Sequence, residues 1–205
     1  MDKLTIVKVG GNLIDDAKAL DEFLQAFSKI EGKKLLVHGG GKLATRMSSQ
    51  LGIKTEMVNG RRITDAENLK IVTMVYAGYV NKSIVAQLHA KRINAIGMAG
   101  CDFDILRAEK RKHPSIDFGY VGDITRVDEK AIAELIEQSG VPVIAPITHD
   151  GKGQLLNTNA DSIVTDVAIG PYLQSELQSK AFEMASKIAS KGQQAIRFAL
   201  KSIKV

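Results

Sequence analysis

Two groups of glycines each follow a short apolar run near the start of the chain. Gly10–Gly11 follow the run at 4–9, and Gly39–Gly41 follow the run at 34–38. Backbone N–H groups at a turn from strand to helix point at whatever lies above the helix N-terminus, where partial positive charge favours an anion. Glycine lets the backbone come close to that anion, at an entropic cost in folding. The two groups therefore predict a backbone cradle for an anion such as a phosphate.

Lys8 stands two residues before Gly10. Residues i and i+2 of a strand point to the same face, so the Lys8 ammonium can reach an anion held by the loops. The alternative is a strand-end lysine that reaches solvent. Ligands of open α/β sheets bind at the edge where parallel strands end, and both glycine groups are expected at that edge. We therefore expect a functional role for Lys8.

Other phosphate-binding motifs match less well. A Walker A loop needs G-x-x-x-x-G-K-[ST], and neither glycine group fits it. The spacing of Gly39, Gly41 and Ala44 fits a dinucleotide fingerprint, but 58–62 reads VNGRR and supplies no acidic residue at the end of a strand. A nicotinamide site is therefore disfavoured.

The elements that must position these residues alternate between strand and helix. This order predicts an α/β fold, with a mainly parallel sheet sandwiched by helices. A hairpin is expected within 104–126 and another, with an Asp-Gly turn, at 148–157. The expected strands are 4–9, 34–38, 93–98 and 141–147, and the expected helices are 16–30, 42–51, 65–91 with a break near Gly78, 128–138, and one that starts near Asn159 or Ala160.

Charge and composition exclude several classes of protein. The formal net charge of the 205 residues is +5, but residues 170–205 hold six Lys/Arg and two Asp/Glu, so the excess lies in the tail. Aromatic residues make up 5% of the chain and none lies in a basic cluster, so no nucleic-acid partner is expected. A single cysteine, Cys101, fits a reducing compartment. We expect a cytoplasmic protein with no membrane segment and no signal peptide.

Six segments occur in a fixed order along the chain: KVGGN at 8–12, VHGGGK at 37–42, VNGRRIT at 58–64, VNKSIV at 80–85, GYVGDI at 119–124 and LLNTNADSI at 155–163. Together they resemble the amino-acid kinase superfamily, and within it the N-acetylglutamate kinases. The resemblance covers about residues 3–169.

The resemblance implies a reaction and its partners. The γ-phosphate of MgATP is transferred to the side-chain carboxylate of N-acetyl-L-glutamate, or of a related N-acyl glutamate, in arginine biosynthesis. ATP and Mg²⁺ are the implied cofactors. A homodimer through the helix at 65–91 is implied as well.

The resemblance also implies roles on the phosphate side of the site. Lys8 neutralises charge on the transferred phosphoryl group, and Asp161 organises the catalytic lysines. Gly10 and Gly11 supply backbone donors to the phosphate. A general base is not required, because the attacking carboxylate is already ionised. The alternative for Asp161 is a plain residue of a helix N-terminus.

On the substrate side, Gly40 and Gly41 are implied to bind the substrate through their backbone. Arg62 would grip its α-carboxylate with a planar, two-pronged guanidinium. Asn157 would bind through its amide, and Arg61 is interpreted as a surface residue.

Other polar residues are given structural roles first. Asn81 and Lys82 are assigned to packing, and His38 is interpreted as structural although it adjoins the glycines. No metal site is expected, because the histidines lack the spacing of metal ligands.

The tail departs from the family pattern. After Ile169 the nucleotide-binding half of the fold is not recognisable, and the apolar spacing from Leu177 predicts a helical hairpin and no strand. Residues 177–203 resemble the terminal helices of the enoyl-CoA hydratase (crotonase) family. We therefore expect an acylglutamate-binding lobe at 1–169 and a helical tail at 170–205.

Three functional hypotheses follow. The first is acetylglutamate kinase, and the second is a catalytically impaired acylglutamate-binding module that lacks the ATP lobe. The third is an interaction protein whose tail docks on acyl-CoA enzymes. The presence of Asp161 without a second recognisable lysine separates the first two, and it favours reduced turnover.

Overall fold

The computed structural model describes residues 3–58, 61–169 and 201–204. Its main sheet has five strands in the order β11-β1-β2-β8-β5. Strands β1, β2, β8 and β5 run parallel, whereas β11 is antiparallel to β1. The parallel α/β architecture expected from the sequence is thus confirmed. The bounds are β1 Lys3–Val9, β2 Lys34–His38, β5 Ala95–Ala99, β8 Val141–Ala145 and β11 Lys201–Lys204.

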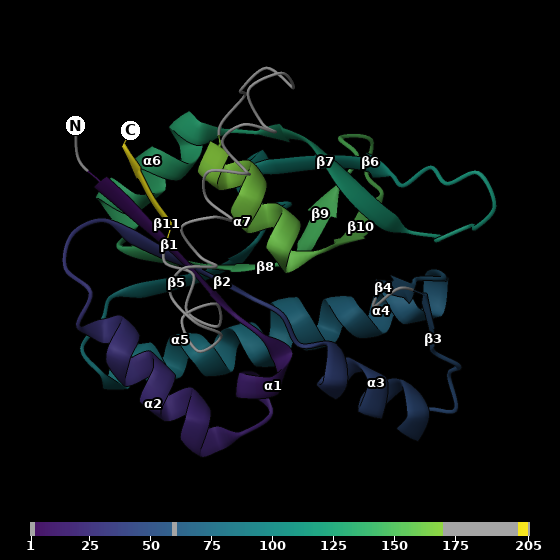
Figure 1. Cartoon of the computed structure of the whole chain (residues 1–205), viewed down its shortest axis with the longest axis horizontal. Helices are drawn as coiled ribbons and strands as arrows, with labels where there is room; N and C mark the ends of the chain where they lie inside the picture. The colour runs from purple at the N-terminus through teal and green to yellow at the C-terminus, as the bar shows by residue number, and fades with distance from the viewer. Residues whose placement is uncertain (1–2, 59–60, 170–200, 205) are drawn as a thin grey trace, which may run out of the picture.

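Helices cover both faces of this sheet (Figure 1). Alternate residues of a strand point to opposite faces, so β1 and β2 feed two separate cores. One core holds Val7 and Leu36 against α2 and a long helix at 66–90, and the other holds Ile6 and Leu35 against α6 and α7. The bounds are α1 Gly11–Ile14, α2 Ala17–Ser28, α3 Gly41–Gln50, α6 Glu129–Ser139 and α7 Ala160–Ile169.

A second sheet of four strands closes on itself beside the main sheet, in the order β10-β7-β6-β9. Strands β6 and β7 are antiparallel, as are β9 and β10, so both predicted hairpins are confirmed. A short hairpin of β3 and β4, which the sequence analysis did not identify, lies between α3 and the long helix. The bounds are β3 Glu56–Val58, β4 Arg61–Ile63, β6 Leu106–Lys110, β7 Val121–Val127, β9 Ile147–His149 and β10 Leu155–Thr158, with a 3₁₀ turn, η2, at Asp102–Asp104.

The apolar run at 141–147 is not one strand, as predicted, but two. Strand β8 ends at Ala145 in the main sheet, and β9 begins at Ile147 in the second sheet. Pro146 separates them, because it has no backbone N–H to continue a ladder. The chain changes sheets at this residue.

The helix predicted at 65–91 is continuous, and the predicted break near Gly78 is wrong. It consists of α4 (Ala66–Thr73), the π-helix η1 (Met74–Val80) and α5 (Asn81–Ala90). The wider π turn accommodates Gly78 without ending the helix. Within the described residues, no helix has the length and apolar character needed to span a membrane.

The expectation that the tail contains no strand is also wrong. Strand β11 pairs with β1, from Lys3 opposite Lys204 to Ile6 opposite Lys201. A strand at the edge of a sheet leaves a row of backbone groups unpaired, and a further strand from the tail satisfies them. Residues 170–200, and with them most of the expected helical hairpin and the crotonase resemblance, lie outside the described part of the chain.

Candidate functional site

The two glycine loops lie directly against each other at the carboxyl ends of β1 and β2. The Gly39 N–H donates to the Val9 carbonyl at 3.1 Å. A Cβ placed on Gly11 would lie 3.6 Å from the Gly41 nitrogen and 4.0 Å from the Gly40 nitrogen. A Cβ on Gly11 would therefore stand in van der Waals contact with the second loop, and the bare backbone leaves that space open.

A cavity of about 210 Å³ opens in front of the loops. Every residue that the sequence analysis assigned to the site lines it. The structure thus brings together residues as far apart in the chain as Lys8 and Asp161. These residues are Lys8, Gly10, Gly11, Gly40, Gly41, Arg62, Asn157 and Asp161.

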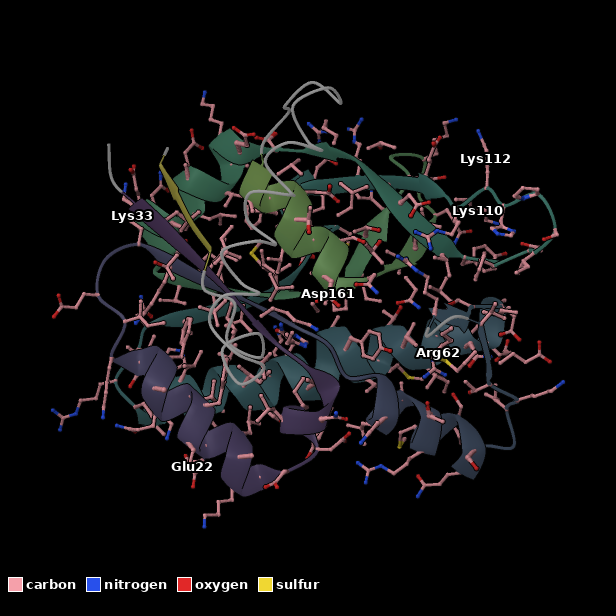
Figure 2. All side chains as sticks on the ribbon, in the orientation of Figure 1. Glu22, Lys33, Arg62, Lys110, Lys112 and Asp161 are labelled. Atoms are coloured by element: carbon pink, nitrogen blue, oxygen red, sulfur yellow. The ribbon has the colours of Figure 1, made fainter. Side chains whose placement is uncertain are left out.

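Lys8 and Asp161 form an ion pair in this cavity, with 2.9 Å between Nζ and Oδ1. Lys8 comes from the end of β1, and Asp161 lies in the first turn of α7, at the end of that helix seen in Figure 2. Asn159 caps α7, because its Oδ1 accepts hydrogen bonds from the Asp161 and Ser162 N–H groups at 2.7 and 3.4 Å. The lysine side chain is 31% exposed and the aspartate 71%, so the pair is accessible to a ligand.

Arg62 is held at the wall of the cavity by neutral oxygens. It donates to Thr55 Oγ1 at 3.0 Å, to the Gly41 carbonyl at 3.0 Å and to Thr45 Oγ1 at 2.8 Å. The residue is only 6% exposed. The β3–β4 hairpin carries Arg62 over the start of α3, so the guanidinium adjoins the second glycine loop.

Asn157 lies on β10, next to the start of α7. Its Nδ2 donates to Thr64 Oγ1 at 3.0 Å, and its backbone N–H donates to the Tyr120 carbonyl at 2.8 Å. Thr64 in turn accepts from the Tyr120 N–H at 2.7 Å. These bonds join the hairpin that carries Arg62 to the second sheet that carries Asn157.

Tyr76 lines the cavity as well, and the sequence analysis missed it. A Cβ on Gly40 would lie 2.9 Å from the Tyr76 ring, so this close approach requires glycine. Burial raises the pKa of the Tyr76 hydroxyl, while the charge and hydrogen bond of Arg62 act in the opposite direction. Tyr76 looks in the sequence like any apolar residue of an amphipathic helix, so no local pattern identified it.

The charges of the lining residues favour an anionic ligand. Lys8, Arg61 and Arg62 contribute three positive charges, and Asp161 contributes the one negative charge. Arg61, interpreted from sequence as a surface residue, lines the cavity too. Among the described residues, no group of three or more His, Cys, Asp or Glu side chains is arranged to hold a metal ion.

Curated relatives match most of the chain. Acetylglutamate kinase of Phocaeicola vulgatus is 58% identical over 167 residues, which cover 82% of this chain and 65% of the relative. Acetylglutamate kinase of Bacteroides fragilis is 53% identical, with 82% of this chain and 64% of the relative covered. The chain therefore spans about two thirds of the length of these relatives.

Solved structures confirm the fold. The chain resembles smu.665 from Streptococcus mutans, with a TM-score of 0.65 and 24% identity over 80% of this chain and 66% of the other. It also resembles N-acetylglutamate synthase from Neisseria gonorrhoeae in complex with coenzyme A and N-acetyl-glutamate, with a TM-score of 0.66 and 20% identity over 80% of this chain and 39% of the other. These similarities show that the described part of the chain shares the fold of the two solved structures.

The profile of the amino acid kinase family matches residues 3–176, which include every residue of the candidate site. Two glycine loops at the carboxyl edge of a parallel sheet, with a lysine and an aspartate paired in front of them, agree with that match. The chain belongs to the amino acid kinase family.

Proposed function

We propose that this chain carries the catalytic and substrate-binding residues of an acetylglutamate kinase, which phosphorylates the side-chain carboxylate of N-acetyl-L-glutamate with MgATP. The observation that supports this most strongly is the convergence of Lys8, Arg62 and both glycine loops on one cavity. The relatives that cover most of the chain are named acetylglutamate kinase.

In the proposed reaction, a carboxylate oxygen of the substrate attacks the γ-phosphorus of ATP. A bond forms between this oxygen and phosphorus while the bond to the bridging oxygen breaks, and ADP leaves. The carboxylate is ionised at neutral pH, so no proton has to be removed. Catalysis then depends on alignment of two anions and on neutralisation of their charge.

The residues divide these tasks. The Lys8 ammonium neutralises charge on the transferred phosphoryl group, and Asp161 holds the ammonium in place through the 2.9 Å ion pair. The N–H groups of Gly10 and Gly11 serve the phosphate side of the cavity. Since phosphoryl transfer needs little covalent chemistry, these electrostatic contacts supply most of the rate enhancement.

The contacts that bind the substrate are proposed from the same geometry. Gly40, Gly41 and Asn157 offer backbone and amide groups to N-acetyl-L-glutamate, and Arg62 binds its α-carboxylate. Because Arg62 already bonds three neutral oxygens, its guanidinium is oriented before the substrate arrives. A side chain held in advance loses less entropy on binding.

Magnesium is proposed to arrive with the nucleotide. The described residues do not offer a cluster of three or more metal-ligating side chains, so they do not fit a metal held by protein alone. Bound to the ATP phosphates, Mg²⁺ supplies further charge neutralisation.

The test measures acyl phosphate made from N-acetyl-L-glutamate and MgATP, trapped with hydroxylamine, on the 205-residue chain. Product that disappears in Lys8→Ala supports the proposal. Calorimetric binding of N-acetyl-L-glutamate without product points to the binding-module hypothesis, which the similarity to kinases does not favour. Absence of both binding and product would overturn both hypotheses.

We also propose that the chain forms a homodimer through the long helix at 65–91. Met74 and Tyr79 of η1 are 59% and 70% exposed, so this helix offers apolar side chains to a second copy of the chain. Light scattering at micromolar concentration tests this, and a monomeric mass would contradict it.

A further inference from the structure

A chain of hydrogen bonds runs from the long helix to the second glycine loop, behind the cavity. Asn81, the first residue of α5, is fully buried, and its Nδ2 lies 3.0 Å from His38 Nε2. His38, the last residue of β2, is also fully buried, and its Nδ1 lies 2.8 Å from the Gly39 carbonyl oxygen. The helix therefore reaches the loop through one imidazole.

The neighbours of Asn81 determine which way its amide points. Its nitrogen donates to the Val143 carbonyl at 2.9 Å, and its oxygen accepts from Lys82 Nζ at 3.2 Å. The amide nitrogen thus faces His38 as a donor. Nε2 of His38 must then accept, which leaves the proton on Nδ1 to be donated to the Gly39 carbonyl.

His38 is neutral in this arrangement. Burial is the main cause that lowers its pKa to about 4; the bond to Gly39 opposes this shift, and the nearby Lys82 charge adds to it. Lys82 itself is fixed, because it donates to the Gly97 carbonyl at 2.8 Å. A neutral ring with one donor and one acceptor matches the partners on its two sides.

The bond from His38 controls the peptide that joins Gly39 to Gly40. A trans peptide is planar, so its carbonyl and its N–H point in opposite directions. When the carbonyl of Gly39 turns back to His38, the N–H of Gly40 turns the other way. Among the described residues none accepts a hydrogen bond from that N–H, and Gly40 lines the cavity.

A peptide between two glycines needs such a hydrogen bond to keep one orientation. Neither residue has a side chain that restricts rotation, so both orientations of the peptide are sterically accessible. Tyr76 limits the loop from a second side, since its ring would lie 2.9 Å from a Cβ on Gly40.

The π-helix explains how one helix supplies both contacts. The Asn81 N–H bonds to the Tyr76 carbonyl, five residues back, as in a π turn. This spacing brings residues five apart onto one face of the helix, which an α-helix does not do. The sheet makes room as well, because a Cβ on Gly97 would lie 2.1 Å from the Asn81 side-chain oxygen.

We propose that Asn81 and His38 are positioning residues that hold the Gly39–Gly40 peptide with its N–H toward the bound anion. The π turn of η1 presents Asn81 and Tyr76 to this loop together. The inference deepens the proposed function, and rests on it for the identity of the anion used in the binding test. π segments inside α-helices are frequent at functional sites, which this role explains here.

The test uses two variants of one residue that differ only in which ring nitrogen they imitate. The side-chain nitrogen of Asn is attached at the same position as Nδ1 of histidine, and that of Gln near the position of Nε2. His38→Asn keeps the donor to the Gly39 carbonyl, and His38→Gln loses it. Asn81→Asp replaces the donor to Nε2 by an acceptor and so favours a proton there.

The measurements are N-acetyl-L-glutamate affinity by calorimetry, melting temperature, and crystal structures of the wild type and both His38 variants. We expect His38→Gln and Asn81→Asp to weaken binding at least about tenfold, the effect of one hydrogen bond to a charged group. His38→Asn is expected to stay within about threefold of the wild type, by the same reasoning. The Gly39–Gly40 peptide should turn over in His38→Gln alone.

Lys34→Met is the matched control. Lys34 is a buried residue at the other end of β2, and its Nζ caps the carbonyls of Phe27, Ser28 and Ile30 at 2.6–3.1 Å. The Lys34→Met substitution should lower the melting temperature and leave the affinity for N-acetyl-L-glutamate unchanged. If affinity falls in Lys34→Met as it does in His38→Gln, or if the peptide and the affinity are unchanged in His38→Gln, the proposal is overturned.

Two further readouts separate this proposal from the proposed function. If the wild type does not bind N-acetyl-L-glutamate, the proposed function fails, and the peptide orientation in the crystal structures decides the role of His38 alone. If the variants do not fold, ¹⁵N-histidine spectra of the wild type decide it. A proton on Nδ1 of His38 supports the proposal, and a proton on Nε2 overturns it.

Discussion

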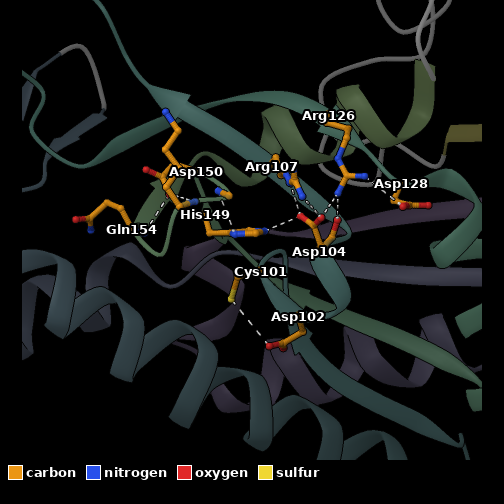
Figure 3. Close-up of polar contacts among 11 residues, drawn as sticks. Cys101, Asp102, Asp104, Arg107, Arg126, Asp128, His149, Asp150 and Gln154 are labelled. Carbon is orange, nitrogen blue, oxygen red and sulfur yellow. Dashed lines mark hydrogen bonds and ion pairs between the residues drawn. The ribbon is translucent and has the colours of Figure 1, made fainter.

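The cavity and a turn on the second sheet use similar side chains for different ends. At the turn, a single carboxylate, Asp104, contacts two arginine side chains and one histidine ring (Figure 3). Arg107 donates to both of its oxygens at 2.8 and 2.6 Å, His149 lies 2.7 Å away, and Arg126 completes the group. In the cavity, one carboxylate lies among three cations, and Asp161 pairs with Lys8.

The difference lies in how many of the charges are matched. Around Asp104 every cation contacts the carboxylate, and Arg126 adds a bond to the Asp104 carbonyl at 2.8 Å. In the cavity, Arg62 bonds only neutral oxygens, and Arg61 makes no ion pair with any described residue. Matched charges hold elements together, whereas unmatched charges next to a cavity attract a ligand.

The Asp104 group also holds a strained turn. Phe103 and Asp104 have φ angles of 52° and 55°, which are uncommon for residues other than glycine. The bonds from Arg126 on β7 and His149 on β9 anchor this turn to two strands of the second sheet. The hydrogen bonds from Arg107, and those from Arg126 and His149, hold the pKa of Asp104 well below its usual range.

The largest effect is expected when the cavity loses its paired lysine. Lys8→Ala should reduce the rate of acyl phosphate formation by about 10²–10³, the loss seen when one preorganised charge-stabilising group is removed. Stability should change by less than about 1 kcal/mol, because the ion pair is partly exposed. The hydroxamate assay and urea unfolding measure the two effects.

Lys42→Ala is the control for that change. Lys42 follows the glycine loop directly but is exposed and does not line the cavity. A rate loss in Lys42→Ala as large as in Lys8→Ala would show that general charge near the loop matters, and not the position of one ammonium.

The next effect concerns the unmatched arginine. Arg62→Ala should weaken N-acetyl-L-glutamate binding by about 100-fold, because the substrate's α-carboxylate loses its buried guanidinium partner. Calorimetry measures it, with Arg46→Ala as the control, since Arg46 on α3 already pairs with Asp15 at 2.9 Å. Equal affinity in the wild type and Arg62→Ala would remove Arg62 from the site.

The matched cluster should respond in the opposite way. Asp104→Asn keeps the size of the side chain but removes the charge, so Arg107 and Arg126 lose their common charged partner. We expect a loss of about 1–2 kcal/mol in the free energy of unfolding, a value that already allows for the partial exposure of the group. Substrate affinity should stay unchanged. A variant of normal stability with weakened binding would reverse the comparison.

The smallest expected effect is on pH dependence. The folded pKa of Asp104 is lowered, so its stabilising contribution is present above the unfolded value, near 4, and is lost as pH falls below it. Wild-type stability should therefore decline in acid more steeply than that of Asp104→Asn. Urea unfolding at pH 6 and pH 3 measures how much free energy of unfolding each protein loses in acid. Equal losses in the wild type and in Asp104→Asn would contradict the role given to Asp104.

Local pattern was enough for most of the main sheet and for the position of the two glycine loops. The strand at 34–38 matches β2, and the helix predicted near Asn159 or Ala160 begins at Ala160. A glycine group after an apolar run predicts a turn at a strand end from a few neighbouring residues. These features could therefore be predicted without knowledge of the fold. The continuous helix at 65–91 could not, because the sequence signal of Gly78 is a break and only packing maintains the π turn.

The candidate site divides in the same way. Its members were identified by residue type, spacing and resemblance, but the pairing of Lys8 with Asp161 depends on how α7 returns to the end of β1. Tyr76 was missed and Asn81 was assigned to packing, since an aromatic or amide residue inside a helix carries no mark of what its face will meet. The pairing of β11 with β1 was missed because the tail has helical apolar spacing.

The sequence by itself determined where bare backbone meets a strand end and which charged residues stand beside it, because these follow from residue type and from periods of two and 3.6. Only the tertiary structure decided which charges are matched. Asp104 meets basic side chains from β6, β7 and β9, while Arg62 meets the carbonyl of Gly41 on α3 and no carboxylate among the described residues. Pairing depends on contacts between residues far apart in the chain, and no local pattern encodes them.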